Sequence, residues 1–178
     1  MNKLKYGFIV SVILAAMALP SMAQQRGGRA SPHDVVNGRV GGKMVAIYYG
    51  RPSAKGRTIW GDLVPWDKPW RLGADEATTL IAQGSIVIGG TTVPAGAYTL
   101  YMVPSKDGTS KLAISKAIGA WGIPVNEKED LARVDLKKED LDAPVEQLTI
   151  SVGRAGSGGV IEIQWEKAQY SVEFTNAP

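Results

Sequence analysis

The stretch YYGRPSAKGRTIWGDLVPWDKPWRLGADEATT, residues 48–79, decides how the rest of the chain is arranged. It holds three of the five tryptophans, three arginines, and several prolines and glycines that interrupt regular structure. A compact domain rarely carries so long an irregular segment unless its own side chains pack it or it serves a function. We therefore expect a lid that its aromatic side chains pin to a folded core, with any functional site concentrated on it.

The sequence on both sides of this segment predicts β-strands. Residues 44–49 form a β-rich run bounded by glycines, and residues 35–40 are its expected hairpin partner across Gly41-Gly42. Further strands are predicted over 77–82, 85–88, 97–103, 111–115, 147–152, 160–166 and 169–174. Residues 127–138 fit a helix by charge and a strand by alternation, and we favour a strand over 132–138. The glycine-rich residues 153–159 predict a flexible hairpin loop.

No helical period persists for three turns, and eight to ten short strands are expected at this spacing. The fold class is therefore all-β: an antiparallel β-sandwich, jelly-roll-like, with one long irregular Arg/Trp-rich segment. About 150 residues suffice for a single domain that buries about two-thirds of its unfolded-chain surface. We expect one domain over residues 31–178, preceded by a flexible leader over 24–30.

The first 23 residues have the layout of a secretory signal peptide. Lys3 and Lys5 precede an apolar run that ends at Leu19, and cleavage is expected after Ala23. The run is short for a membrane span, so no stable membrane anchor is expected after cleavage. The predicted destination is the periplasm or the extracellular space. Without these residues the chain has 18 basic and 17 acidic side chains. This nearly balanced charge gives no reason to expect a nucleic-acid partner.

The residue inventory also limits the chemistry. The chain has no cysteine, which excludes disulfides, thiolate metal sites and a cysteine nucleophile. His33 is the only histidine, so we predict no zinc site, no metal and no cofactor. The glycine clusters precede no predicted helix and therefore do not predict a phosphate-binding loop.

Several motifs resemble the bacterial domain-of-unknown-function family 2911. They are YYGRPSAKGRTIWGDLVPW, WRLGADEAT, VPAGAYTLYMVP, the Trp121-Gly122 dipeptide and VEQLTI, together with the opening Ser-Pro-His at residues 31–33. The resemblance runs in order over nearly the whole chain after residue 30, and it implies export but no particular activity. Asp75 stands where that family more usually carries asparagine.

Arginine and tryptophan side chains are the first candidates for a binding site. Arg51, Arg57 and Arg71 can bind an anion or a sugar acid, since guanidinium recognises carboxylate and phosphate in a planar geometry. The alternative is that they pin the lid to acidic side chains and loop carbonyls, which we favour for at least two of the three. Trp66, next to Asp67, is the candidate for an exposed stacking surface, although a core position is favoured for each lid tryptophan taken singly.

Asp75 and Glu76 complete the predicted site. Glu76 is a candidate hydrogen-bond acceptor, or an acid/base residue if the protein is a hydrolase. Adjacent residues of an extended segment point to opposite faces, so we expect the two carboxylates to diverge. His33 is a candidate lone general base, with a surface or loop-capping role as the commoner outcome.

The predicted function is a non-catalytic binding or structural module for a small anionic or carbohydrate ligand, or for an envelope protein. The alternative is a metal-independent hydrolase of a glycan or ester that uses Glu76 or His33 as acid/base. The sequence leaves open whether the protein is an enzyme.

Overall fold

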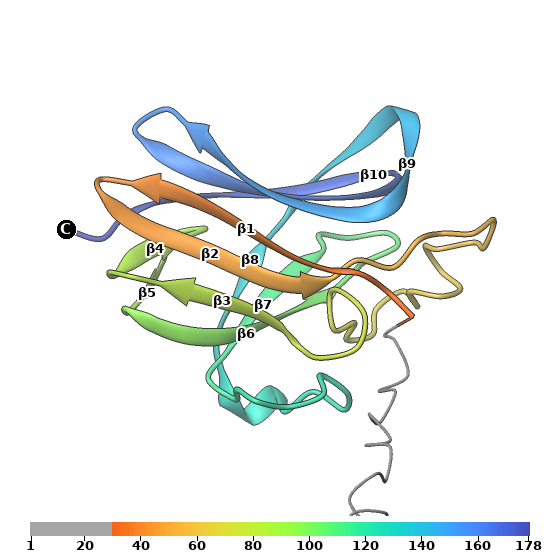
Figure 1. The fold of residues 1–178 in the computed structure, drawn as a ribbon, viewed down its shortest axis with the longest axis horizontal. Helices are drawn as coiled ribbons and strands as arrows, with labels where there is room; N and C mark the ends of the chain where they lie inside the picture. The colour runs from red at the N-terminus through yellow and green to blue at the C-terminus, as the bar shows by residue number, and fades with distance from the viewer. Residues whose placement is uncertain (1–29) are drawn as a thin grey trace, which may run out of the picture.

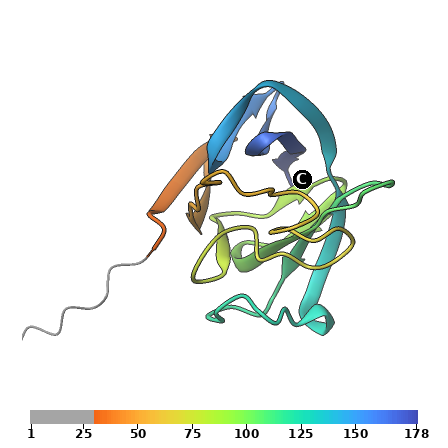
Figure 2. The same ribbon diagram turned by 90° about the vertical axis from the view of Figure 1, so that its right-hand side faces the viewer.

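The computed structural model describes residues 30–178 and shows two antiparallel β-sheets packed face to face (Figures 1 and 2). The larger sheet has the order β1-β2-β3-β6-β7-β8. Its strands are β1 (His33–Val40), β2 (Lys43–Gly50), β3 (Thr78–Ala82), β6 (Gly96–Val103), β7 (Lys111–Ser115) and β8 (Asp130–Asp135). The smaller sheet has the order β5-β4-β10-β9, with β4 (Ile86–Ile88), β5 (Thr91–Val93), β9 (Lys137–Ala155) and β10 (Gly158–Asn176). This architecture confirms the predicted all-β sandwich.

Strand alternation explains why the two sheets pack. On β3 the buried Thr78, Leu80 and Ala82 alternate with half-buried neighbours, and β10 repeats the pattern over Ile161, Ile163 and Trp165. Side chains of a strand point alternately to its two faces, so one face of each sheet is apolar. These faces meet in one hydrophobic core between the layers.

The smaller sheet is built around a hairpin that the sequence predicted only in part. We expected three separate runs and a flexible loop over 153–159, whereas β9 and β10 are continuous strands of 19 residues each. Their pairing continues from Val160–Gly153 to Gly158–Ala155, so the predicted loop is largely strand. Two of the glycines, Gly158 and Gly159, lie where the hairpin contacts its own end: a Cβ on Gly159 would come within 2.4 Å of the Phe174 ring. Close packing, rather than flexibility, accounts for this glycine.

The segment after residue 126 resolves the other ambiguous prediction. A single 3₁₀ turn, η1 (Glu127–Glu129), leads into β8. The expected strand over 132–138 is interrupted at Leu136, whose amide donates to the Ser110 carbonyl, and the chain then passes into the smaller sheet as β9. Residues 30–178 contain no helix long and apolar enough to cross a membrane. The predicted signal peptide and residues 24–29 of the leader lie outside the described residues.

The irregular segment between β2 and β3 is the predicted aromatic-pinned lid. Trp60 contacts three other rings, with centroids 6.2 Å from Trp66, 5.9 Å from Trp70 and 5.0 Å from Tyr170. The Trp70 ring stacks on Trp165 of β10 at 5.8 Å. Backbone hydrogen bonds join the lid to both sheets: Trp70 N to Met102 O at 2.7 Å, and Leu148 N to Pro52 O at 2.9 Å. A long loop with so many partners is held in one conformation.

Candidate functional site

A cleft opens where the end of the lid meets the outer face of β1, β2 and β3. Its volume is about 470 Å³. It is lined by His33, Asp34, Val35, Tyr48, Tyr49, Gly50, Glu76, Ala77 and Thr79. The cleft contains the only histidine of the chain and two of its carboxylates, so it is the first candidate for a functional site.

His33 lies between the two adjacent carboxylates of the lid. Its Nε2 atom is 3.2 Å from Asp75 Oδ2 and 3.5 Å from Glu76 Oε2. Since both oxygens approach the same nitrogen atom, the two carboxylate groups converge on one edge of the imidazole. The structure therefore brings together His33, Asp75 and Glu76, three of the residues predicted from sequence.

The expectation that Asp75 and Glu76 diverge is wrong. It assumed an extended backbone, whereas Asp75 has a φ of 63° in the left-handed region. This conformation turns the chain and directs both carboxylates to one imidazole. Asp is among the few residues with a side chain that tolerate it.

Close backbone contacts hold this turn in place. The Ala74 amide donates to the Gly50 carbonyl at 3.3 Å, and the Thr78 hydroxyl donates to the Leu72 carbonyl at 2.8 Å. A Cβ on Gly50 would lie 2.2 Å from the Ala74 oxygen, so only glycine allows β2 to pass this close to the turn. The motif GADE and the end of β2 thus form one wall of the cleft.

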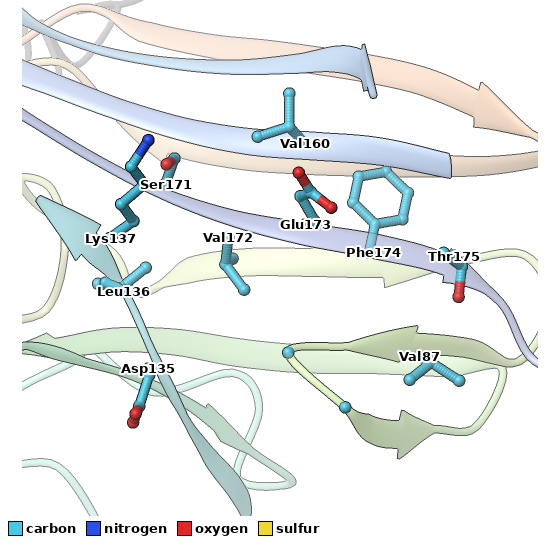
Figure 3. Close-up of a pocket in the computed structure, with 12 residues that line it drawn as sticks. Val87, Asp135, Leu136, Lys137, Val160, Ser171, Val172, Glu173, Phe174 and Thr175 are labelled. Carbon is cyan, nitrogen blue, oxygen red and sulfur yellow. The ribbon is translucent and has the colours of Figure 1, made fainter. Parts of the chain in front are cut away.

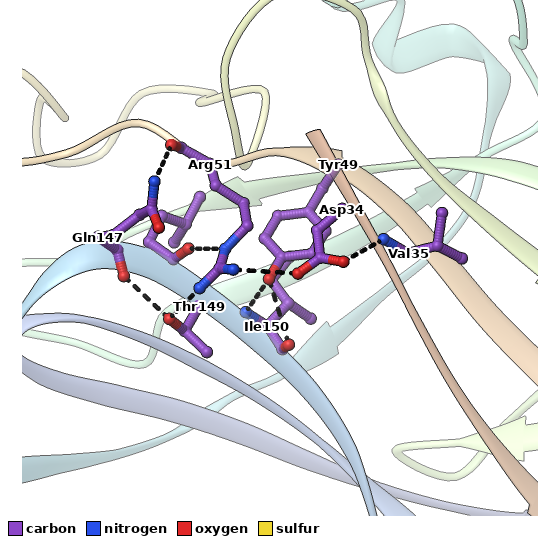
Figure 4. A network of polar contacts seen from close by, with 8 residues as sticks. Asp34, Val35, Tyr49, Arg51, Gln147, Thr149 and Ile150 are labelled. Atoms are coloured by element: carbon purple, nitrogen blue, oxygen red, sulfur yellow. Dashed lines mark hydrogen bonds and ion pairs between the residues drawn. The ribbon is translucent and has the colours of Figure 1, made fainter. Parts of the chain in front are cut away.

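The Arg51 side chain forms hydrogen bonds with other parts of the fold (Figure 4). Its guanidinium donates to Leu148 O at 3.1 Å, to Asp34 Oδ2 at 3.0 Å and to Thr149 Oγ1 at 3.0 Å. These three bonds tie the start of the lid to β9 and to β1. This geometry matches the alternative in which an arginine pins the lid to acidic side chains and carbonyl groups.

The other two arginines also bond to backbone carbonyls of the lid. Arg57 donates to Ser53 O at 2.7 Å and to Ala54 O at 3.0 Å, and it lines a separate hollow beside Glu146. Arg71 donates to Asp75 O at 3.2 Å and so supports the turn behind the cleft. Each of the three guanidinium groups thus bonds to its own partners within the fold, as in the structural role favoured for at least two of them.

The tryptophans differ from prediction in one respect. Trp66 is only half-exposed and stacks on Trp60, so it belongs to the cluster that pins the lid. The strongly exposed tryptophan is Trp121, with 58% of its surface accessible. It follows Ala120, whose carbonyl accepts a 3.4 Å hydrogen bond from the Ala77 amide at the cleft.

Two tyrosines of β2 complete the cleft, and sequence reasoning missed them as site residues. Tyr48 is 44% exposed on the outer face, whereas Tyr49 points inward and exchanges hydrogen bonds with the backbone of Ile150. Burial raises the pKa of Tyr49, so its phenol stays neutral. Strand alternation in the run MVAIYY already implied that one tyrosine faces outward, which was the signal available in the sequence.

A larger groove, of about 690 Å³, lies between β10 and the corner where β8 passes into β9 (Figure 3). Val160, Ser171 and Glu173 project into it from β10. Its charged groups are dispersed: Asp135 is paired with Lys111, and Lys137 is paired with Glu139 at 2.9 Å. Without converging polar groups this groove is a weaker candidate than the His33 cleft.

Metal binding receives no support from the described residues. Within residues 30–178, no group of three or more His, Cys, Asp or Glu side chains is arranged to hold a metal ion.

Comparison with known proteins is informative only at the level of the family. Neither a curated protein nor a solved structure matches the chain. A family model described as a protein of unknown function, DUF2911, matches residues 31–174, which cover the whole sandwich up to the last residues of β10. The chain therefore belongs to the DUF2911 family.

Proposed function

We propose that this protein is an exported, non-catalytic binding module whose His33 cleft takes a neutral carbohydrate. The observation that carries the proposal is the composition of the cleft: an exposed aromatic ring, Tyr48, stands beside converging hydrogen-bonding groups of His33, Glu76 and Thr79. An aromatic face covers the apolar C–H surface of a sugar ring, and carboxylates accept hydrogen bonds from its hydroxyl groups.

The charges of the cleft favour a neutral ligand over an anion. Asp34 and Glu76 line it, and Asp75 adjoins them through His33. No arginine or lysine is among the residues that line this cleft. Arg51 offsets the charge of Asp34, but no guanidinium or ammonium group of the described residues lines the cleft to receive an anion. This distribution argues against the anionic ligand that the three arginines suggested.

A thermal-shift and calorimetric screen tests the proposal. Wild-type protein is titrated with neutral sugars, sugar acids, inorganic phosphate and spermidine. We expect neutral sugars to raise the melting temperature, and we expect Tyr48→Ala and Glu76→Gln to abolish the effect. Arg57→Ala is the matched control, because Arg57 lines a different hollow. Stabilisation by phosphate or sugar acids alone would show that the ligand class is wrong.

A hydrolase is the second candidate, and the arrangement at His33 favours it. Two carboxylates that converge on one imidazole can supply an acid and a base for glycoside or ester hydrolysis. Glu76→Gln distinguishes the two functions. A hydrolase predicts that this variant still binds the sugar but loses turnover of it, whereas a binding module shows no turnover in either protein.

Export is proposed from the sequence of residues 1–23 alone. A neutral glycan of the cell envelope or the surroundings is the ligand that such a protein would meet. An envelope protein that carries such a glycan would present the same ligand to the His33 cleft.

A further inference from the structure

A row of side chains crosses all six strands of the larger sheet on its outer face. Strand registers pair each member with the next one along the row. In sheet order the members are Val35, Tyr48, Thr79, Thr99, Ser115 and Asp130. The adjacent residues on the central strands, such as Ile47, Leu80 and Leu100, point into the core. Except at its first position, the row presents hydroxyl or carboxylate groups away from the core.

Two hollows share this row as their floor. The His33 cleft covers Val35, Tyr48 and Thr79, and a smaller pocket covers Thr99 and Ser115. Thr79 and Thr99 are direct partners on neighbouring strands, which lie about 4.8 Å apart. The two hollows are therefore neighbours.

The smaller pocket has a volume of about 50 Å³, which is room for a few water molecules or one hydroxymethyl-sized group. Thr99 and Ser115 form its floor, and Tyr101 and Asn126 also line it. Tyr101 donates to Asp130 Oδ2 at 2.6 Å and accepts from Arg133 at 2.8 Å, so its hydroxyl is already committed. Burial, followed by the bond to Asp130, raises the pKa of Tyr101 and keeps the phenol neutral.

Thr99 is a buried polar group of this pocket that lacks a partner within residues 30–178. The residue is only 7% exposed, and its Oγ1 atom has no hydrogen-bond partner among the described residues. A buried hydroxyl group without a partner is unfavourable, so buried hydroxyls nearly always find one. A ligand hydroxyl that enters the pocket would supply that partner.

An exposed apolar loop covers the pocket. Ala117, Ala120 and Gly122 of this loop line it, and Trp121 between the last two is 58% exposed. The Ala77 amide donates to the Ala120 carbonyl, and Gly122 packs so closely that a Cβ there would lie 3.2 Å from Ala77 Cα, so this loop adjoins the wall of the His33 cleft. Two exposed aromatic rings thus accompany the hollows: Tyr48 lines the His33 cleft, and Trp121 lies between two residues that line the smaller pocket.

We propose that the pocket under the Trp121 loop is a second subsite, so that the surface takes an extended oligosaccharide rather than a single sugar. Thr99 and Ser115 bond a hydroxymethyl or hydroxyl group of one unit, and Trp121 packs on a ring. The preceding unit occupies the His33 cleft. This inference rests on the proposed carbohydrate-binding function and adds the length of the ligand to it.

Calorimetric titration with saccharides of increasing length tests this inference. The probes are the one- to four-unit members of two neutral series, β-1,4-linked N-acetylglucosamine and α-1,4-linked glucose. We expect the four-unit member of one series to bind wild-type protein at least about tenfold more tightly than its single unit. Thr99→Val is expected to weaken the longer probe about fivefold, and Trp121→Ala about tenfold, without changing the affinity for the single unit.

Ile118→Ala is the matched control, because Ile118 is as exposed as Trp121 in the same loop but, unlike Trp121, is not flanked on both sides by residues that line the pocket. Melting temperatures of all variants separate loss of binding from loss of fold. Equal affinity for one and four units, or a Thr99→Val protein that matches wild type on every probe, overturns the second subsite while the carbohydrate function stands. Absence of binding to either series overturns both proposals together.

Discussion

The indole nitrogen of Trp60 donates a hydrogen bond to the backbone carbonyl of Trp165, with 3.2 Å between the two atoms. This bond joins the lid to β10 across 105 residues of sequence. The same ring packs on Trp66, Trp70 and Tyr170. The lid is therefore part of the folded core, and the cleft at its end has a fixed shape.

Replacing Trp60 tests this relationship. We expect Trp60→Ala to lower the free energy of unfolding by about 3 kcal/mol, because it removes the central ring of the cluster and leaves a cavity. Trp121→Ala is the control and is expected to change stability by about 0.5 kcal/mol or less, since Trp121 is exposed. Urea denaturation followed by far-UV circular dichroism measures both. Equal stability of the two variants would show that the lid is not anchored by its aromatic cluster.

The backbone at Asp75 predicts which substitutions the turn accepts. Asp75→Asn and Asp75→Gly are expected to keep the melting temperature close to wild type, because both residues tolerate a φ of 63°. Asp75→Val is expected to lose about 1–3 kcal/mol, because a β-branched residue is strained in the left-handed region. Thermal unfolding of the three variants checks the order. A valine variant as stable as the glycine variant would contradict the turn.

Arg51 is expected to contribute to stability and not to ligand binding. Its three donor groups reach three different acceptors, which the single ammonium group of lysine cannot match. We expect Arg51→Lys to lose about 1–2 kcal/mol of unfolding free energy, a range that allows for partial screening of the Asp34 pair by solvent. Sugar affinity of the folded variant, measured by calorimetry, is expected to match wild type. A large loss of sugar affinity without loss of stability would show that Arg51 contributes to ligand binding.

Three buried tyrosines predict how stability depends on alkaline pH. Burial raises the pKa of Tyr49, Tyr101 and Tyr170 above the ordinary value. Below about pH 10 the phenols are protonated in both the folded and the unfolded chain, so they add no pH dependence there. Above it, the unfolded chain ionises first, and stability is expected to fall as the pH rises.

Tyrosinate absorbance and near-UV circular dichroism, recorded together during an alkaline titration, measure this effect. Ionisation of the buried tyrosines is expected to coincide with unfolding. Tyr48→Phe serves as control and is expected to leave the unfolding midpoint unchanged, because Tyr48 is exposed. Full ionisation of all tyrosines while the near-UV signal persists would refute the prediction.

The N-terminal segment predicts export in a testable form. Protein recovered from the medium or the periplasmic fraction is expected to begin at Gln24, as N-terminal sequencing would show. Ala23→Trp is expected to block processing, because signal peptidase requires a small residue there. An unprocessed chain in the cytoplasmic fraction would exclude export.

Local sequence patterns were sufficient to predict most of the strands. The hairpin of β1 and β2 forms across Gly41-Gly42 as predicted, and the lid follows β2 as expected. Local patterns were insufficient to predict the full length of β9 and β10, because the glycine-rich residues 153–159 are typical of a loop. Two of those glycines, Gly158 and Gly159, satisfy a packing requirement against Phe174, which lies outside any short sequence window around them.

The candidate site divides in the same way. The sequence named His33, Asp75 and Glu76 among its candidate site residues, and the folded chain brings these three together. Their convergence depends on the left-handed turn at Asp75 and on strand β1, which carries His33 to the lid from 42 residues away. In the sequence the three arginines were equally suitable as ligand-binding residues. In the structure each of them donates a hydrogen bond to a backbone carbonyl group of the fold.

The sequence by itself determined that the chain folds as strands, where the irregular lid lies, and which residue types can do chemistry, because these depend on alternation and backbone preference over a few residues. Only the tertiary structure decided that Trp66 is packed while Trp121 is exposed, and that Thr79 and Thr99 place two hollows side by side. Strand register and burial are set by contacts between segments far apart in the chain, and the free energy of those contacts is a property of the whole fold.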